Sequence, residues 1–153
     1  MTDTETLPPG VPKTAVVVHA HSNFGSEIGY CHYIDEAADP ELVYYLGLTL
    51  QEKHAGAPGR GHGAVTMAML DDVMGRAASK SMNQLCYTAT MTTNFCAASR
   101  VGQFLLARAT VSRKGKNLVF VDATLHAEDC LIATATGTWA NSGLPIPGAG
   151  AKD

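Results

Sequence analysis

The chain has 153 residues, 46% of them hydrophobic and 16% charged, and its formal net charge is −3. These values predict a single globular domain with a full hydrophobic core, and they exclude the global positive field with which proteins bind nucleic acid or acidic membranes. No apolar run approaches the roughly 18 residues of a membrane span, and the acidic first residues lack the apolar segment of a signal peptide. We therefore expect a cytoplasmic protein.

The elements expected before residue 54 are short. Residues 1–13 are polar and rich in proline, which predicts a disordered tail. Every second side chain from Leu42 to Leu50 is apolar, which predicts a strand over residues 42–51 with one buried face. The other expected segments are a short apolar piece at 16–18, a helix start or turn at 22–25, a strand at 28–34 and a turn at 35–40.

A glycine-rich loop then leads into the most informative helix of the chain. Residues 59–64 read Gly-Arg-Gly-His-Gly-Ala, and residues 63–80 are apolar on almost every side at helical spacing, which predicts a buried helix. Free N–H groups at the positive start of a helix bind a carbonyl or an anion. Such a helix start beside a buried carboxylate is typical of an acyl-transfer site. The alternative is a tight loop before a core helix whose acids lie on the surface.

This helix carries two adjacent acids, which a helical wheel separates. At about 100° per residue, the neighbours of Asp71 three and four positions away are two methionines, an alanine and a glycine. Asp72 instead shares a polar stripe with Arg76, which predicts an ordinary solvated pair worth a few tenths of a kcal/mol. Placing a carboxylate in apolar surroundings costs free energy, so such a residue is a candidate for a functional role. Asp71 is therefore the predicted catalytic residue.

Everything after the helix is predicted to be strand. The first strand has an apolar face of odd-numbered positions from Leu85 to Phe95 and a polar face of Thr88, Thr90, Thr92 and Asn94. Residues 141–153 are rich in proline and glycine and predict a flexible tail, which leaves one domain at residues 14–140. The expected strands lie at 85–95, 103–114, 118–127 and 130–139.

The cysteines and histidines predict neither disulfides nor a metal site. The four cysteines lie singly without a Cys-x-x-Cys pair, so we expect reduced, buried thiols. The six histidines show no His-x-x-x-His or mixed Cys/His ligand spacing. We interpret His19 and His21 as a surface pair, with a metal site as the less favoured alternative.

One long helix among antiparallel strands predicts an α+β fold in which a curved sheet wraps around a central helix, the hotdog architecture. Over roughly residues 23–139, the sequence resembles the hotdog-fold acyl-CoA thioesterases of the phenylacetate-pathway (PaaI-like) type. In that family a Gly-x-x-His-Gly-Gly loop leads into the helix, and the catalytic Asp or Glu lies nine positions after the His. Here His62 is followed nine positions later by Asp71, the acid that the helical wheel also selects.

The resemblance implies hydrolysis of acyl-CoA or aryl-CoA thioesters, with specific roles for the residues that match the motif. The backbone N–H of Gly63 would polarise the thioester carbonyl, and Asp71 of a neighbouring subunit would act as general base or as nucleophile. His62 would shape the loop, or take part in the chemistry directly. Thr88 matches a position where some relatives place a hydroxyl beside the water. Gly61 and Ala64, which flank the His-Gly pair, would border the substrate.

The resemblance also implies how coenzyme A and a second subunit bind. Arg113, Lys114 and Lys116 resemble a basic turn that meets the phosphates of coenzyme A, although a solvated hairpin tip explains them equally well. The expected assembly is a homodimer or a dimer of dimers. No cofactor is expected, because coenzyme A is part of the substrate.

The sequence departs from the family pattern at two positions. Ala64 replaces the second glycine of the motif, a mild change in a helix. Gly56 stands where many relatives have an asparagine that binds the substrate carbonyl or the water. Asp71 favours a hydrolase, whereas Gly56 favours the alternative, a non-catalytic hotdog protein that binds acyl-CoA or a related ligand.

Overall fold

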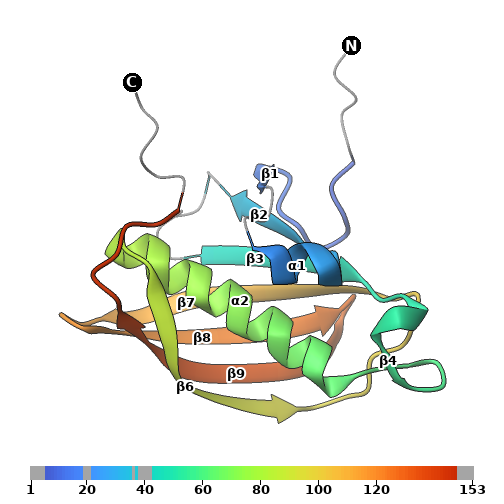
Figure 1. Cartoon of the computed structure of the whole chain (residues 1–153). Coiled ribbons are helices and arrows are strands. Elements are labelled where there is room, and N and C mark those ends of the chain that lie inside the picture. Colours follow the sequence, from blue (N-terminus) through green and yellow to red (C-terminus); the bar gives the residue numbers. More distant parts are fainter. Residues whose placement is uncertain (1–5, 19–21, 36, 38–42, 148–153) are drawn as a thin grey trace.

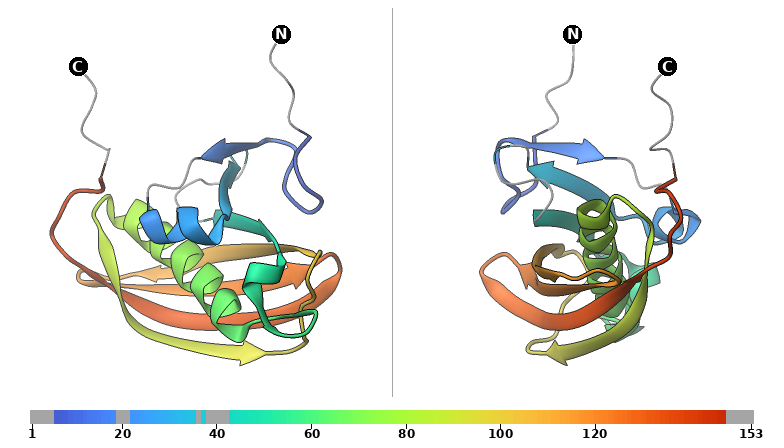
Figure 2. Two further views of the ribbon diagram at one scale, coloured as in Figure 1. Left: turned by 45° about the vertical axis from the view of Figure 1, so that its right-hand side comes forward. Right: turned by 90° about the vertical axis from the view of Figure 1, so that its left-hand side faces the viewer.

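A curved antiparallel sheet wraps around one long helix, and this arrangement is the hotdog fold expected from the sequence (Figure 1). In the computed structural model, residues 6–18, 22–35, 37 and 43–147 are described. The helix, α2 (Gly63–Met82), lies in the hollow of the sheet, as the end-on view of Figure 2 shows. The His19–His21 pair, most of the turn at 35–40 and the ends of both expected tails lie outside the described residues.

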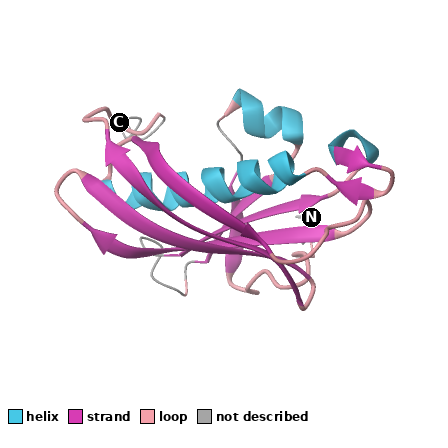
Figure 3. Cartoon of the chain, turned by 90° about the horizontal axis from the view of Figure 1, so that it is seen from below, coloured by secondary structure: helices cyan, strands magenta, loops and turns pink. Residues whose placement is uncertain are grey.

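Seven strands form the sheet, in the order β1-β2-β3-β7-β8-β9-β6 with every neighbouring pair antiparallel. Seen from below in Figure 3, the sheet covers one whole side of α2. The strands predicted after the helix are confirmed to within two residues at their ends. Their bounds are β1 Ala15–Val18, β2 Cys31–Asp35, β3 Val43–Thr49, β6 Cys86–Phe95, β7 Phe104–Lys114, β8 Leu118–Ala127 and β9 Cys130–Asn141.

The hydrophobic core lies between α2 and the concave face of the sheet. From the helix, Leu70 and Met74 are fully buried, and they pack in one cluster with Leu46, Leu105 and Trp139 of the strands. Burying each such side chain stabilises the fold by about 1.5–3 kcal/mol. The core therefore fixes the orientation of α2, and with it the direction of the acids on this helix.

In the first third of the chain, the helix start expected at residues 22–25 is confirmed, and the structure adds elements that the sequence pattern did not show. Helix α1 (Asn23–Ile28) is capped by Ser22, whose hydroxyl accepts from Gly25 N, and it ends at Gly29, where φ is +92°. The strand expected from residue 28 therefore begins only at Cys31, because Ile28 belongs to the helix. Before the glycine-rich loop, the short 3₁₀ helix η1 (Glu52–His54) precedes a two-stranded ribbon of β4 (Ala55–Ala57) and β5 (Arg60–Gly61), and β5 is part of that loop.

The described parts of the two expected tails contact the domain. Val11 is buried in a small second cluster with Ala15 and Tyr33, on the face of the sheet away from α2. At the other end, the Ser142 hydroxyl donates to Leu85 O at 2.6 Å. Both segments therefore differ from the free tails that their composition predicted.

All four cysteines are free thiols, as expected, but only Cys86 is buried. The expectation of buried thiols is wrong for Cys31, Cys96 and Cys130, which are exposed. Within the described residues, no helix is long and apolar enough to cross a membrane.

Strand β6 is an edge of the sheet and is exposed along most of its length. Cys86 is its only buried residue, and Tyr87 and Phe95 are each 55% exposed. A long edge strand with exposed aromatic side chains presents unpaired backbone groups to a partner. This edge lies beside α2, on the side where the predicted catalytic residue is found.

Candidate active site

His62 caps the start of α2 and leaves one backbone donor open. Its Nδ1 accepts from Ala64 N at 2.9 Å, and its carbonyl accepts from Val65 N at 3.0 Å. The N–H of Gly63 has no hydrogen-bond partner among the described residues. A free N–H at the positive end of a 20-residue helix attracts a carbonyl oxygen or an anion. His62 is thus the N-cap of α2, and its role in the proposed chemistry stays a prediction.

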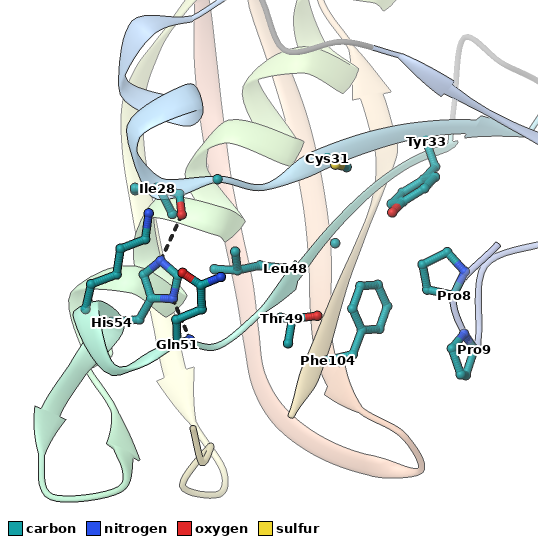
Figure 4. A pocket seen from close by; sticks show the side chains of 13 residues that line it. Pro8, Pro9, Ile28, Cys31, Tyr33, Leu48, Thr49, Gln51, His54 and Phe104 are labelled. Atoms are coloured by element: carbon teal, nitrogen blue, oxygen red, sulfur yellow. Dashed lines mark hydrogen bonds between the residues drawn. The ribbon is translucent and has the colours of Figure 1, made fainter. Parts of the chain in front are cut away.

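The buried imidazole of His54 anchors the loop before the helix (Figure 4). Its Nε2 lies 2.8 Å from Ile28 O, and its Nδ1 accepts from Gln51 N at 2.9 Å. The carbonyl of His54 also accepts from the N–H of His62 at 2.8 Å. His54 is therefore a structural residue that holds the glycine loop against α1.

Gly56 lies directly under the imidazole of His62. A Cβ at this position would be only 2.6 Å from His62 Cδ2 and 3.1 Å from its Cα. An asparagine, which the family resemblance leads one to expect here, would therefore displace the ring from its capping position. The glycine at position 56 therefore allows His62 to keep the conformation in which it caps α2.

Asp71 and Thr88 are brought together by α2 and β6. The Thr88 hydroxyl donates to Asp71 Oδ1 at 2.6 Å, and Asp71 is half-buried. This hydrogen bond fixes the orientation of the carboxylate. The arrangement is that of a carboxylate prepared to bind or activate a water molecule.

A β-bulge directs Thr88 toward the helix. In the pairing of β6 with β9, Thr88 lies opposite Trp139 and Thr90 opposite Thr138, so Ala89 is an additional residue. Beyond the bulge the alternation is reversed, and Thr90 contacts Thr138 on the face away from α2. Thr90, Thr92 and Asn94 therefore share one face as predicted, whereas the prediction that Thr88 lies on the same face is wrong. Bulges of this kind commonly orient a side chain at an active site.

The interpretation of Asp72 as a solvated helix-surface residue is also wrong. Its Oδ2 lies 3.4 Å from Nε2 of His32, a residue of β2 that is fully buried. Burial alone would raise the pKa of Asp72, but hydrogen bonds to His32 and Tyr30 and the charges of His32 and Arg76 outweigh it and lower this pKa. Burial and the nearby Asp72 carboxylate in turn raise the pKa of Tyr30.

A cleft of about 340 Å³ opens beside Asp71 and Thr88. One wall is α2, where Gly75 allows the indole of Trp139 to pack closely: a Cβ there would be only 3.2 Å from Trp139 Nε1. Arg76 also lines this cleft. Its other lining residues are Ser22, Asp72, Ser79, Leu85, Cys86, Tyr87, Trp139, Ile146 and Pro147.

Gly63 faces a different hollow from Asp71. A depression of about 420 Å³ borders Gly63, Gly61 and Phe95 but not Asp71. Eight residues of helix separate Gly63 from Asp71, a rise of about 12 Å. One carbonyl group therefore cannot contact the Gly63 amide and the Asp71 carboxylate of the same subunit at once.

The basic residues of the β7–β8 turn lie near the other end of α2. Lys114 Nζ donates to Ser81 O at 2.6 Å, so this ammonium group stabilises the negative end of the helix. Arg113 and Lys116 are exposed. Lys114 is thus not part of a free hairpin tip, and a role of this turn in phosphate binding stays a prediction.

Several residues in and around the cleft escaped the sequence patterns. Tyr30 and His32 do not line the cleft but interact with Asp72, and no sequence spacing relates them to the helix. Gly75 and Arg76 follow the two acids, but only the packing shows that they line a cleft. Within the described part of the chain, no three His, Cys, Asp or Glu side chains converge as ligands for a metal.

The comparisons with known proteins agree with the fold and the motif. Residues 59–134 match the model of the thioesterase superfamily. The chain is 29% identical over 103 residues to a Pseudomonas aeruginosa protein named "Putative esterase PA0474", a match that covers 66% of this chain and 77% of that protein.

Among solved structures, the chain is similar to the Escherichia coli PaaI protein of the phenylacetic acid degradation operon. The TM-score is 0.74 at 17% identity, over 82% of this chain and 88% of the other. The phenylacetic acid degradation-related protein of Ralstonia eutropha gives a TM-score of 0.70 at 24% identity, over 80% and 92% of the two chains. A Streptococcus mutans protein, solved with acetyl-CoA bound, gives 0.63 at 21% identity, over 68% and 84%. At these identities the structural matches show the shared fold.

Proposed function

We propose that this chain is a member of the thioesterase superfamily, whose model matches residues 59–134, and that it hydrolyses the thioester bond of acyl-CoA or aryl-CoA substrates. The observation that carries the proposal is the pair of Asp71 and Thr88 at the mouth of a cleft, in a chain whose Gly63 N–H is open at a helix start. The Asp71 carboxylate beside Thr88 can activate a water molecule, and the Gly63 N–H can stabilise a developing oxyanion. The likeness to a protein that binds acetyl-CoA supports coenzyme A as the thiol part of the substrate.

The proposed reaction needs only water. The thioester carbonyl accepts a hydrogen bond from Gly63 N–H, and the Asp71 carboxylate takes a proton from a water molecule held beside Thr88. The hydroxide adds to the carbonyl carbon, the oxyanion is stabilised by the helix start, and the C–S bond breaks as the thiolate of coenzyme A takes the proton. Direct attack by the carboxylate, followed by hydrolysis of the anhydride, gives the same products.

The proposed site is shared between two subunits. Within one chain, Gly63 and Asp71 are about 12 Å apart along the helix axis and border different hollows. Pairing at the exposed edge strand β6 would cover its aromatic side chains and bring a second copy of α2 close to the first. We therefore propose a dimer, or a dimer of dimers, as the active unit.

Coenzyme A is proposed to contact the protein outside the reacting centre. Gly61 and Ala64 lie beside the proposed oxyanion donor and would border the thioester. The exposed cations Arg113 and Lys116, with Lys114, would meet the phosphates. Such contacts are equal in the ground state and the transition state, so they would lower KM without changing kcat.

Release of free thiol from a panel of acyl-CoA and aryl-CoA esters tests this function, with the wild-type protein beside Asp71→Asn. We expect turnover by the wild type and a loss of orders of magnitude in the variant. The second candidate is a hotdog protein that binds acyl-CoA without hydrolysing it, which the glycine at position 56 favours. Saturable binding of the esters without any thiol release would support this second function and contradict the first.

A further inference from the structure

We propose that the acyl group of the preferred substrate ends in a carboxylate, which Arg76 binds in the cleft. The substrate class would then be the half-thioester of a dicarboxylic acid with coenzyme A. This inference rests on the proposed thioester hydrolysis. It is carried by a guanidinium group that faces the cleft without an ion-pair partner among the described residues.

Arg76 lies at a suitable distance from the reacting centre. It is five residues beyond Asp71 on the same helix, a rise of about 7.5 Å. Between the two, Gly75 lets the indole of Trp139 pack closely against α2, because a Cβ at this position would be only 3.2 Å from the indole nitrogen. The cleft of about 340 Å³, which both Asp71 and Arg76 line, has room for a short acyl chain between the carboxylate and the guanidinium.

Among the described residues, Arg76 has no ion-pair partner within 4 Å. The side chain is half-buried, and its buried Nε has no hydrogen-bond partner among the same residues. The charge of Arg76 acts on Asp72 through space, but the Oδ2 of Asp72 lies 3.4 Å from Nε2 of His32. A partly desolvated guanidinium is costly unless an anion binds it, and its planar set of N–H groups fits a carboxylate with two parallel hydrogen bonds.

The apolar side chains that line the cleft fit the acyl chain of the expected substrate. Leu85, Ile146 and Pro147 line it together with the indole of Trp139. These side chains suit a methylene chain and offer no other cation to the far end of the acyl group. A neutral acyl chain would fill the same space but would leave Arg76 unpaired.

An alternative role for Arg76 is purely structural. Its positive charge acts on Asp72 through space, and it would then stabilise α2 whatever the substrate. The two roles differ in one measurable respect. A structural residue affects all substrates alike, whereas a residue that binds the acyl carboxylate affects only substrates that carry one.

The test compares two CoA esters of equal chain length, adipyl-CoA and hexanoyl-CoA. For the wild type, we expect kcat/KM to be at least about tenfold higher for adipyl-CoA, since a hydrogen-bonded contact between charged groups is worth about tenfold to a hundredfold. In Arg76→Gln this preference should disappear, while hydrolysis of hexanoyl-CoA changes less than about threefold. Arg76→Lys keeps the charge and should retain part of the preference. Lys80→Gln, which removes an exposed cation one turn further along α2, should leave both substrates unchanged.

The outcomes separate the inference from the function on which it rests. Thiol release from hexanoyl-CoA without a preference for adipyl-CoA in the wild type overturns the inference and leaves the thioesterase function intact. Equal losses for both esters in Arg76→Gln also overturn it, in favour of the structural role. Failure to hydrolyse any CoA ester overturns the proposed function itself. The wild-type comparison needs no variant, so the inference is decided even if Arg76→Gln does not fold.

Discussion

The hydroxyl of Thr88 donates a hydrogen bond of 2.6 Å to Oδ1 of Asp71, and it thereby connects the edge strand β6 to the middle of α2. One oxygen of the carboxylate is occupied by this bond, which leaves the other oxygen for water. A single additional residue in β6, Ala89, is what turns Thr88 toward the helix. The strand and the helix thus contribute one half each to a proposed water-activating pair.

Thr88→Val tests the importance of this hydrogen bond, because valine keeps the shape of threonine and removes only the hydroxyl. We expect kcat to fall about tenfold or more, since a hydrogen bond to a charged group contributes about 1.5–3 kcal/mol. Thr88→Ser retains the donor and should keep most of the activity. The measurement is thiol release from an acyl-CoA ester, with thermal unfolding as the control for stability. Equal activity of the valine and serine variants would show that the bond has no catalytic role.

The two adjacent acids should respond differently to the same substitution. Asp71→Asn should lower turnover by orders of magnitude and leave the unfolding free energy nearly unchanged, because this carboxylate faces the cleft. Asp72→Asn should cost about 1–3 kcal/mol of stability, since it disrupts a contact with the buried His32. Activity and chemical denaturation of both variants provide the comparison. A stable, fully active Asp72→Asn beside an unstable Asp71→Asn would reverse these assignments.

The lowered pKa of Asp72 predicts a dependence of stability on pH. In the folded protein this pKa lies below its usual 3.8, so folding favours the ionised form. The resulting stabilisation is present above the unfolded-state pKa, and it is lost as the pH falls through the folded-state pKa. The difference in unfolding free energy between wild type and Asp72→Asn should therefore be constant near neutral pH and shrink below about pH 4. Denaturant unfolding at a series of pH values measures it. A difference that grows in acid would contradict this.

The helical pattern selects Asp71 as the candidate catalytic residue, which stays a prediction, and it places its neighbour Asp72 wrongly. A wheel shows which residues of one helix share a face, and it carries no information on what packs against that face. The wheel predicts that Asp72 is exposed to solvent, because Arg76 lies on the same polar face of the helix. In the structure, Tyr30 and His32 cover that face from a segment 40 residues away in sequence.

Sequence patterns also predict the strands only in part. Period-two alternation predicted the position of β6 within a residue, because alternation is a local property of the chain. The bulge at Ala89 depends on how β6 pairs with β9, and nothing in the sequence of β6 marks it. The loop motif around His62 was recognisable because it is local, whereas the position of Gly56 under the imidazole required the folded loop.

Gly63→Pro offers a clean test of the proposed oxyanion donor. Gly63 is the first residue of α2, a position where proline is well tolerated, and His62 before it has φ −72° and ψ 135°, which suits a residue that precedes proline. The substitution removes the N–H and adds the pyrrolidine ring, whose Cβ the alanine variant below controls for. We expect kcat to fall about a hundredfold to a thousandfold, with the melting temperature maintained. Gly63→Ala keeps the N–H, and a Cβ here meets only Phe95 at 3.4 Å, so this variant should remain active.

Mixed dimers of the two inactive variants test whether the site is shared. In a dimer of one Gly63→Pro subunit and one Asp71→Asn subunit, one of the two sites combines both changes, and the other combines an intact Gly63 amide with an intact Asp71. Each mixed dimer should therefore contain one active site. After unfolding and refolding an equal mixture, half of the dimers are mixed, so about a quarter of the wild-type activity should return.

The two variants refolded separately are the control and should both stay inactive. Sedimentation at the assay concentration should show a dimer or a larger assembly in every sample. If Gly63 and Asp71 of the same subunit formed the site, every subunit of the mixture would carry one defect, and no activity would return. A fully active monomer would likewise contradict the shared site, because about 12 Å of helix separates the two groups within one chain.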